Sequence, residues 1–272
     1  MKKIQYIIII AFISMFYSCT KVIDIDLNDA NPQYVIQGVL YAGQHDFIVN
    51  ISQTTSYFSP SSPAEVKNAQ VSLSDENGIA YEMSYLEEGD YLLTSFLAEE
   101  LMEYTLQVNI GEKEFVASAK VAPFVAIDSI KLDIREDEFE NRVENGVKIW
   151  FTNHSENNNY YQIESFINSQ EPYNNQRMII GDYEDFESSN NAFIYIDEET
   201  ENDVVIMIEL RTIDEKSYHY FNSLDEQIDG GGGPGGGASP ANPKSNWSNG
   251  ALGYFGTGNS DFASIVWDNT QN

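Results

Sequence analysis

The sequence Tyr104-Thr-Leu-Gln-Val-Asn-Ile110 alternates without a break between apolar and polar residues. Successive side chains of a β-strand point to opposite faces of the sheet, so this alternation predicts a strand with one buried and one solvated face. Residues 47–51 repeat the pattern, with Phe47, Val49 and Ile51 on one face. Further short strand-like runs lie at residues 34–40, 69–74, 79–84, 91–94 and 115–120.

Turn-forming sequences separate these runs. They lie at residues 75–78, 88–90 and 111–113, and each combines glycine with acidic neighbours. About seven strands at a spacing of roughly ten residues are typical of an immunoglobulin-like β-sandwich. We predict this fold for residues 33–122, which lack the cysteine pair and the core tryptophan of antibody domains. No catalytic signature lies in this region, so we expect a scaffold or a recognition module.

Residues 123–272 predict a second antiparallel β-domain, either a meander or a barrel-like arrangement, with one helix. Residues 135–144 are nearly all charged, which predicts a solvated loop. The continuously apolar run at residues 204–210, interrupted only by Glu209, is typical of a central strand. The other strand-like runs lie at residues 147–152, 160–167, 177–180, 193–196, 252–255 and 263–267.

The predicted helix begins near residue 212. Thr212 precedes Glu215 by three residues, which is the spacing of a capping box. Apolar and aromatic residues then recur at helical spacing as far as residue 228, and Gly230 follows them. We expect this helix to place an aromatic face against the sheet.

A glycine-rich sequence follows the predicted helix, with seven glycines among residues 230–237. A phosphate-binding loop would require Gly-Lys-Ser/Thr at the start of a helix, and Lys244-Ser245 has no glycine before it. We therefore predict that residues 229–245 form a flexible surface loop.

The first 18 residues are predicted to be a signal peptide. A basic start precedes an apolar run over residues 4–16, which is too short to span a bilayer as a helix. The run leads to Ser18-Cys19, an ending that resembles a bacterial lipobox, although the two aromatic residues before Ser18 depart from the strict motif. The resemblance implies cleavage before Cys19 and attachment of acyl chains such as palmitate to it, with residues 19–32 as a tether. The alternative is a plain signal peptide followed by a core cysteine.

Composition limits the classes of protein that fit. The mature chain would keep 254 of 272 residues, enough for one large β-domain or two of ordinary size. Its 43 acidic and 14 basic residues give a net charge of −29, which excludes nucleic-acid binding. Such a surface could hold divalent cations or cationic peptides loosely, or only keep the protein soluble. Cys19 is the one cysteine, so its acylation would leave no thiol for a disulfide.

Two acidic clusters with aromatic neighbours are the candidate sites for a cation or a cationic ligand. The first contains Asp182, Glu184 and Asp185, and the second contains Asp197 and Glu198. Carboxylate oxygens are the ligands that calcium prefers. The alternative is that both clusters are solvated turns, and the sequence leaves the metal unknown.

No motif of an enzyme appears. The three histidines, at positions 45, 154 and 219, are far apart and lack metal-ligand spacing. The sequence has neither a Gly-x-Ser-x-Gly elbow nor a zinc-binding His-Glu-x-x-His. Carboxylates are too numerous for a glycosidase-like pair to be chosen. We therefore predict no catalytic residue, no cofactor and no enzymatic activity.

Three parts of the chain together carry a family resemblance. The first is Cys19-Thr-Lys-Val-Ile-Asp-Ile-Asp26 leading into Tyr34-Val-Ile-Gln-Gly38. The second is Val71-Ser-Leu-Ser-Asp75 and Tyr104-Thr-Leu-Gln-Val108, followed by Ala122-Pro123 and Ile127-Asp-Ser129, and the third is Ser245-Asn246 with Gly250-Ala-Leu-Gly-Tyr-Phe-Gly256.

Together these parts resemble a family of Bacteroidota outer-membrane lipoproteins that is classed as a domain of unknown function. Genes of this family often lie beside those of TonB-dependent receptors. The resemblance implies an outer-membrane location and a transporter barrel as partner, and it transfers no catalytic residue.

We therefore expect a lipid-anchored outer-membrane accessory or binding protein. It would assist a TonB-dependent transporter in capturing or importing a small-molecule or peptide ligand. Two alternatives remain open: a cell-surface hydrolase of glycan or peptide that uses carboxylates, and a structural adhesin. Acidic residues directly after the lipidated cysteine would indicate export to the surface, but Thr20 and Lys21 come first. The sequence leaves open which face of the membrane carries the protein.

Overall fold

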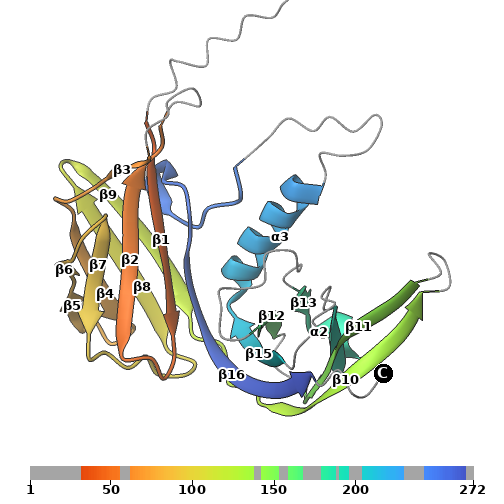
Figure 1. Cartoon of the computed structure of the whole chain (residues 1–272). Coiled ribbons are helices and arrows are strands. Elements are labelled where there is room, and N and C mark those ends of the chain that lie inside the picture. The colour runs from red at the N-terminus through yellow and green to blue at the C-terminus, as the bar shows by residue number, and fades with distance from the viewer. Residues whose placement is uncertain are drawn as a thin grey trace, which may run out of the picture.

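A computed structural model describes eight stretches of the chain (Figure 1). Cys19, most of the predicted tether and the glycine-rich sequence at 230–241 lie outside the described residues. The described chain is mainly β, with three sheets and two α-helices, and none of its sheets closes into a barrel. No helix within it is both long and apolar enough to cross a membrane. The stretches are residues 32–55, 62–137, 142–152, 159–167, 179–187, 190–195, 204–229 and 242–267.

The first half forms a β-sandwich. Strands β1, β2, β7 and β6, with β3 added beside β2, face the sheet β5-β4-β8-β9, and the first hydrophobic core lies between them. In β8, Tyr104, Leu106 and Val108 are buried, so the predicted alternation is confirmed. The strands are β1 (Tyr34–Tyr41), β2 (Asp46–Gln53), β3 (Ala64–Glu65), β4 (Gln70–Asp75), β5 (Ala80–Glu82), β6 (Ser84–Tyr85), β7 (Asp90–Thr94), β8 (Glu103–Ile110) and β9 (Lys113–Lys120).

The second half forms another two-layer arrangement. The sheet β10-β11-β14 packs against β13, β12, β15 and β16, and the buried residues between them, such as Phe151, Ile163 and Ile208, form a second core. Its elements are β10 (Ile127–Asp137), β11 (Arg142–Phe151), β12 (Tyr160–Ile167), β13 (Ile179–Asp182), α2 (Tyr183–Glu187), β14 (Asn191–Tyr195), β15 (Val204–Ile213), α3 (Glu215–Asp229), the short 3-10 turn η2 (Ser248–Gly250) and β16 (Phe255–Trp267).

Strand β16 belongs to both halves (Figure 1). Its first residues pair in parallel with β1, from Gly38 with Phe255 to Tyr41 with Gly258. From Gly258 onward it pairs antiparallel with β15. One nine-stranded sheet therefore runs through both sandwiches, and β16 is its central connection.

Two strand predictions differ from the structure. The final runs at residues 252–255 and 263–267 were expected to be separate strands, but a single strand spans Phe255–Trp267. The charged run at 135–144 was expected to be a loop, but β10 continues to Asp137 and β11 begins at Arg142. The pairing of the two strands extends from Ile127 with Phe151 to Asp137 with Arg142, so the charged run prolongs a hairpin that begins in its apolar part.

The helix prediction is correct in position but wrong in its cap. Asp214, not Thr212, begins α3: its Oδ1 accepts hydrogen bonds from the backbone N–H groups of Lys216 (3.0 Å) and Ser217 (3.1 Å). Thr212 remains in β15, where its hydroxyl donates to the carbonyl of Pro123 (2.6 Å). An aspartate is as good an N-cap as threonine, so local spacing could not decide between them.

Candidate functional site

A cleft of about 360 Å³ lies where the two sandwiches meet, and we call it the junction pocket. The β9 end and the segment after it supply one wall, and the starts of β12 and α3 supply the other. This volume is within the range of sites for small ligands. The lining residues are Leu101, Lys120, Val121, Ala122, Pro123, Asn159, Tyr160, Ile213, Asp214 and Glu215.

Hydrogen bonds from the second half fix the backbone of the first wall. Thr257 donates from its hydroxyl to the carbonyl of Lys120 (2.7 Å), and Asn259 donates to the carbonyl of Ala122. Thr212 holds Pro123 in the same way. The carbonyls of Lys120, Ala122 and Pro123 thus each have a partner on β15 or β16, and that of Val121 accepts from the backbone N–H of Leu101 (3.0 Å). The wall is held in place before any ligand binds.

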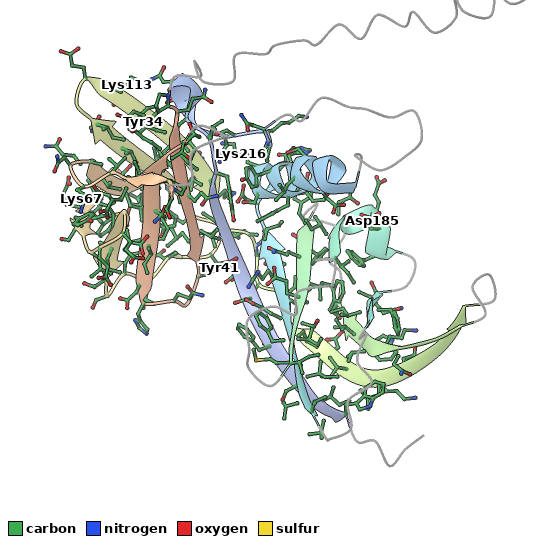
Figure 2. The ribbon with its side chains drawn as sticks, turned by 45° about the horizontal axis from the view of Figure 1, so that its top comes forward. Tyr34, Tyr41, Lys67, Lys113, Asp185 and Lys216 are labelled. Atoms are coloured by element: carbon green, nitrogen blue, oxygen red, sulfur yellow. The ribbon has the colours of Figure 1, made fainter. Side chains whose placement is uncertain are left out.

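Helix α3 is attached to the same place through Asp214, which is 8% exposed. Besides its two capping bonds, its carboxylate accepts from the Ser217 hydroxyl (2.6 Å) and from the backbone N–H of Thr257 (2.8 Å). Burial raises the pKa of Asp214, while these four bonds act in the opposite direction. Lys216 extends from the helix to the carbonyl of Ser118 in β9 (2.7 Å), and Figure 2 shows this residue between the two halves.

Asn159 lines the pocket, but its side chain contacts the second core. The residue is 3% exposed, and its Nδ2 donates to the hydroxyl of Tyr161 (3.2 Å), a fully buried residue of that core. Its Oδ1 has no hydrogen-bond partner among the described residues. Because this oxygen is buried, it is not a group that the pocket presents to a ligand.

Two charged residues of opposite sign flank the pocket. Lys120 and Glu215 are both exposed, and Lys120 forms no ion pair with any residue that the structure describes. The carboxylate of Glu215 lies 3.7 Å from the His219 ring one helical turn away. Tyr160 packs against Tyr218 of α3, with ring centroids 4.6 Å apart and the rings tilted by 32°. The pocket thus offers one exposed cation and one exposed carboxylate among mostly apolar groups.

A buried ionic network holds the sheet together below the pocket. Arg211 of β15 forms an ion pair with Glu164 of β12 (2.9 Å), and a second with Glu209. Its guanidinium also lies over the ring of Tyr41 in β1, and Figure 2 labels this tyrosine. Burial opposes the charge of Arg211, but the Glu209 bond and the nearby Tyr41 and carboxylates raise its pKa overall. Burial also raises the pKa of Tyr41 to about 12.

A second cleft, of about 450 Å³, lies at the end of the first sandwich where the chain enters it. Tyr34 and Lys113 line it, with the Lys113 ammonium 5.3 Å from the centre of the Tyr34 ring (Figure 2). It is larger, but its wall residues belong to the first sandwich and the turn η2. The junction pocket takes its walls from both halves of the chain, so we treat it as the better candidate for a specific ligand.

The acidic residues singled out from the sequence are only partly described. Asp182, Glu184 and Asp185 lie at the start of α2. Asp182 accepts from the backbone N–H groups of Glu184 (2.9 Å) and Asp185 (3.3 Å), and Asp185 accepts from that of Asp182 (2.9 Å). The carboxylates of Asp182 and Asp185 thus cap α2, a role that the sequence analysis did not predict. Asp197, Glu198 and Cys19 lie outside the described residues.

Metal ligands do not gather in the described part of the chain. No group of three or more histidine, cysteine, aspartate or glutamate residues there could hold an ion. His45 lies in an exposed turn, His219 is exposed on α3, and His154 is outside the described residues. Cation binding at the acidic clusters stays a prediction.

The sequence analysis predicted neither the junction pocket nor the ionic network around Arg211. Glu164, Glu209 and Arg211 interrupt otherwise apolar strands, and charged residues at such positions signal a buried network. Asn159 gave no comparable signal, because one asparagine among several in a polar run looks like a loop residue.

Fold and site together define a two-sandwich β-protein with a small pocket between its halves. Residues 20–262 match the model of DUF4249, described as a domain of unknown function, and the chain belongs to this family. No curated protein matches the sequence.

Two solved structures were compared with the chain. A two-domain fibronectin type III segment of chicken tenascin has 12% identity and a TM-score of 0.23, and covers 67% of this chain and 91% of its own. Bovine butyrophilin has 10% identity and a TM-score of 0.21, with coverages of 66% and 92%. Superpositions this poor support no argument about function.

Proposed function

We propose that the chain is a lipid-anchored binding protein of the outer membrane that assists a TonB-dependent transporter in ligand capture or uptake. The observation that carries the binding role is the junction pocket, whose walls come from both halves of the chain and are held by hydrogen bonds such as those of Thr212 and Thr257. A cleft of this size that combines apolar walls with a few polar groups is typical of a site for a small ligand. The anchor and the transporter come from the signal sequence, Cys19 and the family resemblance.

The tether would give the body freedom to reach a partner. Twelve residues separate Cys19 from residue 32, where the described chain begins. The 13 steps from Cys19 to residue 32 span at most roughly 45 Å when fully extended. The junction pocket could thus approach the mouth of a neighbouring barrel while the lipid stays in the membrane.

The charge of the protein supports the same arrangement. A net charge of −29 repels the anionic groups of a lipid surface. The body would be held away from the membrane rather than lie flat on it, which keeps the pocket accessible to ligand.

The junction pocket does not support the hydrolase alternative. Asp214 is its buried carboxylate, and both oxygens already accept hydrogen bonds from Lys216, Ser217 and Thr257. A carboxylate engaged in this way serves as a helix cap and has no free lone pair directed at a substrate.

Co-purification from the native outer membrane tests the proposal. The full lipoprotein, tagged at its C-terminus, is extracted in mild detergent, and the proteins retained with it are quantified. An unrelated lipoprotein with the same tag is the control. One TonB-dependent barrel in near-equal molar amount, absent from the control, is the expected result. Recovery of the lipoprotein alone would refute a stable complex and leave a free-standing binding protein or adhesin.

A further inference from the structure

Strand β9 lies at one end of the sheet β5-β4-β8-β9, so only one of its two sides pairs with a neighbouring strand of that sheet. An open strand edge presents N–H and C=O groups that can pair with a strand of another molecule. We propose that side chains from the second half of the chain close the β9 edge and thereby prevent β9 from pairing with β9 of a second copy. The inference goes beyond the proposed function and does not depend on it.

Side chains take the place of a neighbouring strand along this edge. Alternate residues of an antiparallel strand direct their N–H and C=O groups to alternate sides. The residues of β9 that point away from β8 are at even positions, and each has a backbone group bonded to a side chain of α3, η2 or β16. The carbonyls of Glu114, Ser118 and Lys120 accept from Asn249 (2.8 Å), Lys216 (2.7 Å) and Thr257 (2.7 Å), and the N–H of Val116 donates to the hydroxyl of Ser248 (2.8 Å).

The β9 edge is complementary to a second copy of itself. In an antiparallel pair centred on Ala117, Glu114 would lie opposite Lys120 of the other copy, and both of these residues are exposed. Opposite charges at directly paired positions stabilise a sheet. Val116 would lie opposite Ser118, and the paired backbone groups would be the ones that face the free edge. An open edge would therefore favour a dimer with two-fold symmetry.

Three substitutions open the edge. Lys216→Met, Ser248→Ala and Asn249→Gly remove three of the four side-chain partners, and glycine suits position 249 because the φ there is +55°. Thr257 is left in place because it is completely buried. The measurement is the protein mass of the full lipoprotein in detergent, obtained by light scattering combined with absorbance. We expect the mass of the triple variant to rise twofold with concentration, while that of the unsubstituted protein stays constant.

Two further substitutions test whether the association uses the β9 edge. Val116→Pro removes an N–H that faces the free edge, so β9 keeps its bonds to β8. Added to the triple variant, this substitution should restore the mass of the unsubstituted protein. Glu114→Lys, added instead, would place a cation opposite Lys120 of the second copy and should weaken the association about tenfold.

Controls separate edge pairing from a loss of folding. Lys67→Met removes an exposed lysine that pairs with Glu65, and it should leave the mass unchanged. Circular dichroism shows whether each variant is folded. If the triple variant is unfolded, the double variant of the exposed residues, Lys216→Met with Asn249→Gly, is measured in the same way with the same expected result.

Two results would overturn the inference. The first is a folded open-edge variant that keeps the mass of the unsubstituted protein at every concentration. The second is association that persists after Val116→Pro is added. Either result leaves the proposed function untouched, because neither the transporter nor a ligand takes part in the measurement.

Discussion

Arg211 of β15 lies with its guanidinium carbon 5.5 Å from the centre of the Tyr41 ring in β1. The two residues come from opposite halves of the chain and meet where β16 passes between their strands. The contact ties the second sandwich to the first. Arg211 is important for stability because it also neutralises the carboxylates of Glu164 and Glu209.

Replacing Arg211 should therefore destabilise the protein strongly. Arg211→Met leaves two largely buried carboxylates without their cation, and breaking one partner of a buried pair costs about 3 kcal/mol or more. Urea denaturation at neutral pH measures the loss in free energy of unfolding.

Lys67 provides the matched control for this prediction (Figure 2). It pairs with Glu65 at the surface, where its side chain is 59% exposed, so Lys67→Met should leave the free energy of unfolding nearly unchanged. Equal costs for the two variants would show that the Arg211 network contributes no more than an exposed pair.

Asp214 should make stability depend on pH. Burial raises its pKa in the folded state above the ordinary value of 3.8, so the folded state binds its proton more tightly than the unfolded state. The contribution of Asp214 is therefore fully present below pH 3.8 and decreases as pH rises through the raised folded value. Asn caps a helix as well as Asp does, so Asp214→Asn isolates the charge.

The measurement is the difference in free energy of unfolding between the unsubstituted protein and Asp214→Asn across pH 3.5 to 7. We expect this difference to fall as pH rises above 3.8. A difference that increases with pH would mean that the four hydrogen bonds to the carboxylate outweigh its burial.

Gly258 is the position where β16 exchanges β1 for β15 as its partner. A Cβ there would lie 2.5 Å from the Thr212 carbonyl oxygen, so Gly258→Ala should force the strands apart and cost about 2 kcal/mol. Thermal unfolding measures the loss.

Gly43 is the comparison for that substitution, because a Cβ there meets no atom within 4 Å and only its φ of +80° opposes alanine. Gly43→Ala should cost about 1 kcal/mol. A smaller loss of stability for Gly258→Ala than for Gly43→Ala would contradict the close approach of β16 to β15 at Gly258.

Cys19 should determine the location of the protein. Cys19→Ala removes the thiol that the signal sequence marks for acylation, so we expect the variant to leave the membrane fraction and to incorporate no labelled palmitate. Cell fractionation with an alkyne-palmitate label measures both. Membrane retention with full labelling would place the acyl chain elsewhere.

Local patterns explain how much of the fold could be predicted. The alternation in residues 104–110 sets which side chains of β8 are buried, and the structure buries Leu106 and Val108 completely. Periodic apolar residues, at strand or helical spacing, likewise predict most of the other strands and α3. It failed for β16, because Gly256 and Gly258 look like turn residues although close packing against Ser217 and Thr212 is what requires them.

The junction pocket could not be predicted, because its parts are distant in the sequence. Lys120, Asn159 and Asp214 become neighbours only when β16 joins the two sandwiches. Periodicity reports which face of a strand is buried and contains no information about such long-range contacts. The acidic clusters were candidate sites on composition alone. In the described cluster, Asp182 and Asp185 cap α2.

The most direct test is a quantitative measurement of the proteins that co-purify with the full lipoprotein from its native outer membrane. The account predicts one TonB-dependent barrel in near-equal molar amount. Recovery of the lipoprotein alone would contradict it.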